Sequence, residues 1–182
     1  MGPNRGKDGR VNRIPSFVRP LIALVAFAAV GLPARAEAKS DPKVDAFVTA
    51  FIASFEKSTG AKIPTSEATC IGTKFLAGVK LGDLLKATAS NDLTQPQKAA
   101  LTKSFGVCLS GATYKSVLKK NLAKQFTQGQ LTCIGDKAVA QLGVPALIDL
   151  DFKSYSGVVA NAATAAKTEA ALTKIALACA GK

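Results

Sequence analysis

The sequence predicts an all-α fold, built as a tandem duplication of a three-helix unit in which one disulfide closes each copy. The tetrapeptide Thr-Cys-Ile-Gly occurs at residues 69–72 and again at residues 132–135. Apolar residues recur at helical spacing through most of the chain, and no window alternates strictly between apolar and polar residues. The four cysteines form an even set, which suits one bridge per copy.

The duplication extends beyond the tetrapeptide. Residues 69–85 align without gaps on residues 132–148 with seven identities in seventeen positions. Residues 99–108 align on residues 170–179 with six identities in ten, including both cysteines. The second copy carries eight more residues between its cysteines, which a longer loop or helix absorbs at little cost.

An export signal is predicted for residues 1–36, with cleavage after Ala36. A basic leader precedes the twelve apolar residues 21–32, which are too few to span a bilayer because a spanning helix needs about 20. An uncleaved anchor is the alternative. The rest of the chain then divides into helical repeats at residues 37–111 and 112–182, packed as one compact unit.

The first copy is expected to begin with an amphipathic helix whose apolar face consists of Val44, Phe47, Val48, Phe51, Ile52 and Phe55. Gly60 ends this helix, and Pro64 prevents its continuation. Thr65 is the expected cap of the second helix, whose apolar side is formed by Ala68, Ile71, Phe75 and Val79 and extended by Leu81, Leu84 and Leu85.

A turn at residues 91–96 leads to the third helix. Thr94 and Gln97 form a capping box, and Pro96 falls in the first turn, where its missing amide is harmless. The inner face of this helix is Leu101, Phe105, Cys108 and Leu109.

The second copy repeats this order after a break at Gly111. Its first helix carries Tyr114, Val117, Leu118, Leu122 and Phe126. Thr127 and Gln130 then cap the cysteine-bearing helix, which residues 143–145 break. The last helix holds Leu172, Ile175, Ala176 and Cys179 on one face.

Disulfides are the expected state of the cysteines in an exported chain, and four cysteines permit three pairings. An ancestral single copy had only its own two cysteines to pair. The duplication therefore favours Cys70 with Cys108 and Cys133 with Cys179, whose separations are 38 and 46 residues. A bridge between Cys108 and Cys133 would contradict this assignment.

Catalytic chemistry finds little support in the sequence, and no catalytic residue, metal or cofactor is predicted. The chain contains no histidine, which removes the usual general base and a common zinc ligand. Asp149 and Asp151 flank Leu150 in an expected turn, where aspartate usually caps the backbone. Lys74 and Lys137 recur in both copies and are expected to be solvated, with their stems covering the core.

The surface is predicted to be basic through lysine alone. From residue 37 onward there are 18 lysines against 11 acids and no arginine. One cluster occupies a single predicted helix: Lys115, Lys119, Lys120 and Lys124. A solvated face that keeps the protein soluble is the favoured interpretation, because charged faces are the usual outer side of amphipathic helices. The alternative is contact with an anionic envelope surface or lipid, whereas specific nucleic-acid binding is not expected without arginine. The sequence leaves a protein partner open.

The expected function is that of an exported, non-catalytic helical protein with a binding or structural role in the cell envelope or outside the cell. A carrier of an apolar ligand, such as a fatty acid or lipid, is the alternative function. The first copy concentrates phenylalanines at helical spacing, and the candidate ligand-lining residues are Phe47, Phe51, Phe75 and Phe105. The second copy replaces most of them with leucine or alanine, so the two interiors differ. Phenylalanine at this spacing is usually core, which is the competing interpretation.

Residues 64–179 combine a Ser/Thr-x-x-x-Cys helix start, a Gly-x-x-x-Leu continuation and a capped helix that ends in cysteine. In this arrangement the chain resembles small exported two-cysteine helical repeat proteins of actinobacteria. Those proteins tend to have several acids near the first cysteine, whereas this chain has only Glu67. The resemblance implies an exported all-α protein and no particular activity.

Overall fold

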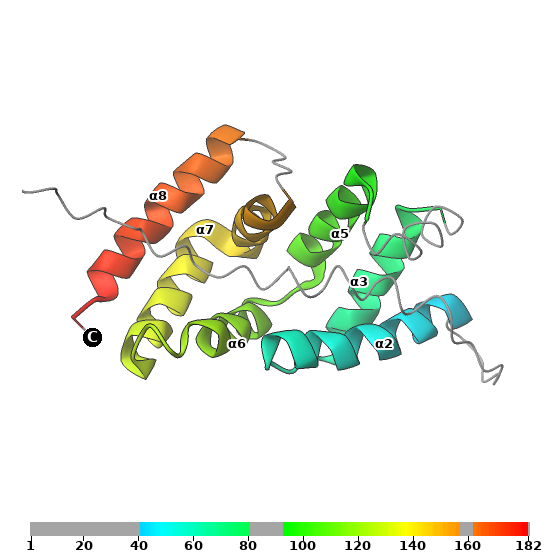
Figure 1. The fold of residues 1–182 in the computed structure, drawn as a ribbon, viewed down its shortest axis with the longest axis horizontal. Coiled ribbons are helices and arrows are strands. Elements are labelled where there is room, and N and C mark those ends of the chain that lie inside the picture. Colours follow the sequence, from blue (N-terminus) through cyan, green and yellow to red (C-terminus); the bar gives the residue numbers. More distant parts are fainter. Residues whose placement is uncertain (1–40, 81–92, 157–161, 182) are drawn as a thin grey trace, which may run out of the picture.

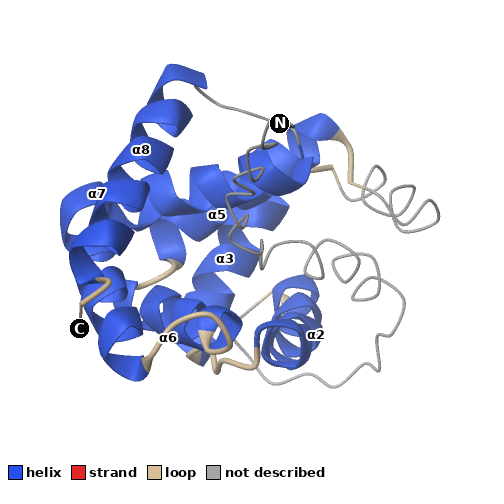
Figure 2. Cartoon of the chain, turned by 60° about the vertical axis from the view of Figure 1, so that its left-hand side comes forward, coloured by secondary structure: helices blue, strands red, loops and turns tan. Residues whose placement is uncertain are grey.

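The computed structural model describes residues 41–80, 93–156 and 162–181. These residues form helices and no strand, which confirms the all-α prediction (Figure 1; Figure 2). The helices are α2 (Pro42–Thr59), α3 (Thr65–Ala77), α5 (Gln95–Cys108), α6 (Gly111–Leu122), α7 (Gln128–Ser156) and α8 (Ala162–Cys179). The predicted export signal and the predicted extension through Leu81, Leu84 and Leu85 lie outside the described residues.

Local capping sets most helix ends where the sequence predicts them. The Asp41 side chain accepts a hydrogen bond from the Lys43 amide at 3.0 Å and starts α2. Gly60 ends the same helix with φ of 66°, a left-handed conformation that glycine adopts without steric cost. Thr94 and Gln97 form the predicted capping box of α5, with Gln97 Oε1 2.8 Å from the Thr94 amide.

Two predicted boundaries need correction. Thr65 is the first residue of α3 and does not cap it; Pro64 occupies the capping position and offers no side-chain hydrogen bond. Helix α6 ends at Leu122, so Phe126 lies beyond the helix in which it was expected. It stays partly buried against the core from the turn that leads to α7.

Helix α7 combines a confirmed start with an unexpected continuation. Thr127 and Gln130 form its capping box, with 2.9 Å between the Thr127 amide and Gln130 Oε1. Gly143 has φ of 75° and kinks the helix, as the predicted break requires. Helix resumes directly after the kink, because proline is tolerated in a first helical turn. Asp149 and Asp151 are therefore helical, which corrects the predicted turn.

The helices pack in the same order along both halves of the chain. In the first half α2 packs on α3 and α3 on α5; in the second half α6 packs on α7 and α7 on α8. The halves meet where α5 packs on α7, and α2 also contacts α6 (Figure 1). This order agrees with the predicted duplication, which itself remains a prediction.

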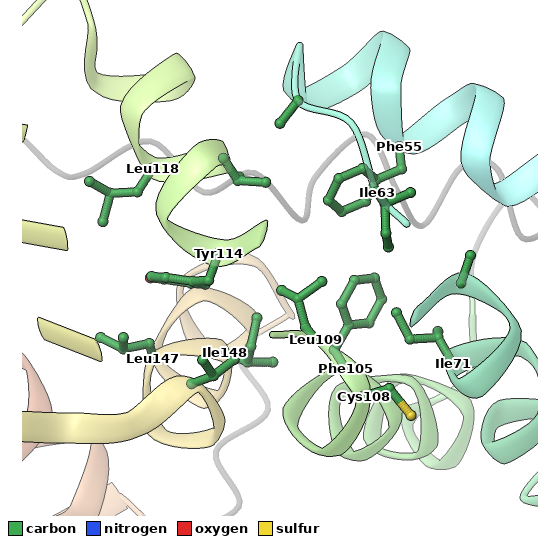
Figure 3. Packing of buried hydrophobic residues seen from close by; sticks show 14 of the residues in the cluster. Phe55, Ile63, Ile71, Phe105, Cys108, Leu109, Tyr114, Leu118, Leu147 and Ile148 are labelled. Atoms are coloured by element: carbon green, nitrogen blue, oxygen red, sulfur yellow. The ribbon is translucent and has the colours of Figure 1, made fainter. Parts of the chain in front are cut away.

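One hydrophobic core runs through both halves. In the first half it is aromatic, with Phe55, Phe75 and Phe105 fully buried. In the second half it is aliphatic, with Leu147 and Ile148 among its most buried members. Figure 3 shows Leu109 between the two groups, so the interface between the halves is part of a single core.

Residues Gln128–Asp151 are long and apolar enough to cross a membrane by length and composition alone. Four of their larger apolar side chains are buried in the protein, Leu131, Ile134, Leu147 and Ile148, and three more are partly buried, Val139, Leu142 and Leu150. Contacts of α7 with α5, α6 and α8 account for this burial. The apolar character of α7 is that of a central core helix.

Candidate functional site

The four cysteines pair as predicted, Cys70 with Cys108 and Cys133 with Cys179. The first bridge joins α3 to α5 and the second joins α7 to α8, with Cα–Cα distances of 5.6 and 5.8 Å. Each bridge therefore fastens one helical hairpin within one half of the chain. The bridges fix the scaffold on which the exposed side chains of α6 are held.

Helix α6 begins where an acid from α3 meets its first turn. The Ser110 side chain accepts a hydrogen bond from the Thr113 amide at 3.2 Å and caps the helix. The Glu67 carboxylate accepts from the Ser110 amide at 3.2 Å and from the Thr113 hydroxyl at 3.1 Å. A negative charge at the positive end of a helix stabilises it, so Glu67 anchors α6 to the first half.

The predicted lysine cluster lies on α6 and the turn after it. Lys115 differs from the others because its Nζ pairs with Asp136 Oδ1 of α7 at 2.9 Å. The hydrogen bond and charge of Lys115 lower the pKa of Asp136, and the charge of Lys119 adds to this effect. Lys115 is therefore partly neutralised.

The other three lysines point away from the core. Lys119 is half-exposed, whereas Lys120 and Lys124 are exposed. No described acid forms an ion pair with Lys120 or Lys124. From residue 93 to residue 135 the chain has six lysines and no acid, so this stretch presents cations with little local compensation. Lys74 and Lys137 are also exposed, as predicted.

A buried polar pair that the sequence does not reveal lies where α6 meets α7. The Tyr114 hydroxyl donates a hydrogen bond to Asp151 Oδ2 at 3.4 Å. Burial raises the pKa of Asp151 to about 8, against the opposing effect of that hydrogen bond. Burial also raises the pKa of Tyr114, and partial burial raises that of Asp149. The sequence did contain one signal for the burial of Asp151. In a helix, residue 151 lies one turn beyond Leu147 and Ile148 and therefore on the same apolar face.

The chain contains no histidine, so this pair has no histidine with which to share acid–base chemistry. No described residues group three or more histidine, cysteine, aspartate or glutamate side chains in a way that suits a metal ion. The arrangement of Tyr114 and Asp151 is that of a buried hydrogen bond between two helices.

The four phenylalanines predicted to line a ligand site come together between α2, α3 and α5. The Phe47 ring centroid lies 5.5 Å from that of Phe51 and 5.7 Å from that of Phe75. Phe51 and Phe105 are 5.7 Å apart in an edge-on arrangement. At these distances the rings contact one another, and all four are buried. They form the aromatic core of the first half.

No protein-family model matches the chain, and neither does any curated protein or solved structure.

Proposed function

We propose that this is an exported, non-catalytic helical protein that binds an anionic surface of the cell envelope through the lysines of α6. The observation that carries the proposal is the excess of positive charge in residues 93–135, which include six lysines and no acid; Lys115 pairs with Asp136, just outside this stretch. Exposed Lys120 and Lys124 place part of this charge at the surface. A face of one sign attracts polyanions and repels cations.

The choice of lysine supports surface attachment over recognition of one small anion. Arginine presents a planar fork that matches a phosphate or carboxylate in two hydrogen bonds, whereas lysine acts as a flexible point charge. From residue 37 onward every basic side chain is lysine. Such a face suits many spaced negative charges whose positions are not fixed.

A location outside the cytosol fits the two disulfides. Both disulfides are compatible with an extracytoplasmic location, because the cytosol keeps most thiols reduced. The predicted signal at residues 1–36 points the same way. Outside the cytosol, anionic lipid headgroups and acidic wall polymers are the abundant counterions of a basic protein.

The alternative function, a carrier of an apolar ligand, has less structural support than surface binding. The candidate residues Phe47, Phe51, Phe75 and Phe105 are packed against one another, so a ligand among them would have to displace ring contacts. We therefore assign these rings to stability.

Binding to vesicles that contain phosphatidylglycerol tests the proposal, with pure phosphatidylcholine vesicles and soluble polyphosphate as separate arms. Replacing Lys119, Lys120 and Lys124 by glutamine is expected to weaken vesicle binding about 100-fold at low salt, since each lysine near an anionic surface contributes about 1 kcal/mol. The matched control replaces exposed Lys43, Lys74 and Lys174, which changes the net charge equally on other helices. Equal loss in both variants, or no binding by the unmodified protein, contradicts the proposal.

A further inference from the structure

We infer that the anion-binding surface spans both halves of the chain and that its partner is an anionic lipid bilayer. This inference rests on the proposed function and adds two lysines from the first half. We call the combined surface the two-helix lysine face, and its members are Lys57, Lys62, Lys119, Lys120 and Lys124.

A close contact between the halves places these lysines together. A Cβ atom built on Gly60 would lie 3.9 Å from Cδ of Lys120, so the Lys120 stem crosses the end of α2. Lys57 is in the last turn of α2, three residues before Gly60, and Lys62 follows two residues after it. Figure 2 shows α2 beside α6, in agreement with the contact between these helices. Lysines about 60 positions apart in sequence thus share one surface.

The charges of α2 differ between its two ends: lysines lie at and just after its C-terminal end, and aspartates lie at its N-terminal end. Lys57 and Lys62 are exposed. Asp41 and Asp45 lie toward the opposite end, about 24 and 18 Å from Lys57 at 1.5 Å per residue. Glu56 is the acid next to Lys57 in sequence, and it is half-buried. This positive end of α2 is the end that Lys120 of α6 approaches.

A bilayer fits this surface better than a single phosphate does. The five cations come from two helices and the segments after them, so one small anion reaches only some of them. A bilayer offers many headgroups at once, and lysine stems extend far enough to meet headgroups at different positions. Each lysine near such a surface strengthens binding about five-fold, and the attraction falls with ionic strength.

Vesicle binding by the chain from Glu37 onward, with both disulfides formed, tests the inference. This chain retains every described core residue, the first of which is Val44, and lacks the apolar leader that would itself enter lipid. Lys57→Gln with Lys62→Gln is expected to weaken binding to phosphatidylglycerol vesicles about 30-fold. The control, Lys43→Gln with Lys174→Gln, removes the same charge from exposed positions elsewhere and is expected to bind nearly as the unmodified chain does. Thermal melts of both variants verify that they fold equally.

The outcomes separate this inference from the proposed function. If the variant at Lys57 and Lys62 binds like its control while the variant at Lys119, Lys120 and Lys124 loses binding, the surface is confined to α6 and the inference is wrong. If the unmodified chain binds neither anionic vesicles nor soluble polyphosphate at low salt, the proposed function fails together with the inference. Binding to soluble polyphosphate and not to vesicles overturns the choice of a bilayer.

Discussion

The Tyr114 hydroxyl and the Asp151 carboxyl hold α6 and α7 together through a buried hydrogen bond, with 3.4 Å between Oη and Oδ2. Burial makes the charged form of Asp151 unfavourable and raises its pKa to about 8. The stability of this helix contact therefore depends on a proton.

The first prediction concerns pH. Between the unfolded pKa of about 3.9 and the native value near 8, the native state holds a proton that the unfolded chain has released. The free energy of unfolding is therefore expected to fall as pH rises through this window, by at most about 1.4 kcal/mol per pH unit from Asp151. The raised pKa of Asp149 acts in the same direction. Urea unfolding at a series of pH values measures the slope.

Asp151→Asn is the matched variant, because its amide oxygen still accepts the hydrogen bond from Tyr114 and does not ionise. Its unfolding free energy is expected to vary less with pH than that of the unmodified protein between pH 5 and 8. Equal slopes in the two proteins would assign the pH dependence to other groups.

The second prediction uses the glycine of the repeated tetrapeptide. A Cβ on Gly72 would lie 2.8 Å from Cδ1 of Phe47, which is buried. Gly72→Ala is therefore expected to destabilise the protein by about 1–3 kcal/mol through overpacking. Calorimetry or urea unfolding measures the change.

The equivalent glycine supplies the control. A Cβ on Gly135 would lie 3.2 Å from Cγ of Lys115, a flexible side chain that moves aside easily. Gly135→Ala is expected to be neutral or to stabilise α7 by up to about 1 kcal/mol, since alanine favours helix. The same loss at both positions would argue against the Phe47 contact as the cause.

The third prediction concerns the disulfides. The bridges close loops of 38 and 46 residues. Replacing either pair of cysteines by alanine is expected to cost about 4 kcal/mol by the loop-closure relation. Unfolding of each double variant under oxidising conditions measures the cost. A variant that retains full stability would show that core packing alone holds that hairpin.

The fourth prediction concerns the start of α6. Glu67→Ala removes the acceptor of the Ser110 amide and of the Thr113 hydroxyl, and Thr113 is buried. The expected loss of stability is about 1–3 kcal/mol, because buried donors are left without a partner. Unfolding by urea checks it. Gln130 occupies the equivalent position in the second half, where it donates to the Ala180 carbonyl and accepts from the Thr127 amide, both at exposed sites. Gln130→Ala should therefore cost less.

Features that depend on a few neighbouring residues were predictable from the sequence. Gly60 as the end of α2, and the two capping boxes at Thr94 and Thr127, involve hydrogen bonds that span only a few positions. The wrong predictions concerned features that depend on contacts between residues far apart in sequence. Asp149 and Asp151 were placed in a turn because Gly143 and Pro145 signal a break, yet packing of the segment after the kink restores the helix.

The sequence by itself determined the helical class, the pairing of the cysteines and the excess of lysine, because periodicity, duplication and composition are properties of the chain alone. Only the tertiary structure decided that Asp151 meets Tyr114, that Glu67 binds the first turn of α6 and that Lys120 lies against the end of α2. Such contacts join helices far apart in sequence, and the packing of the shared core sets which faces meet.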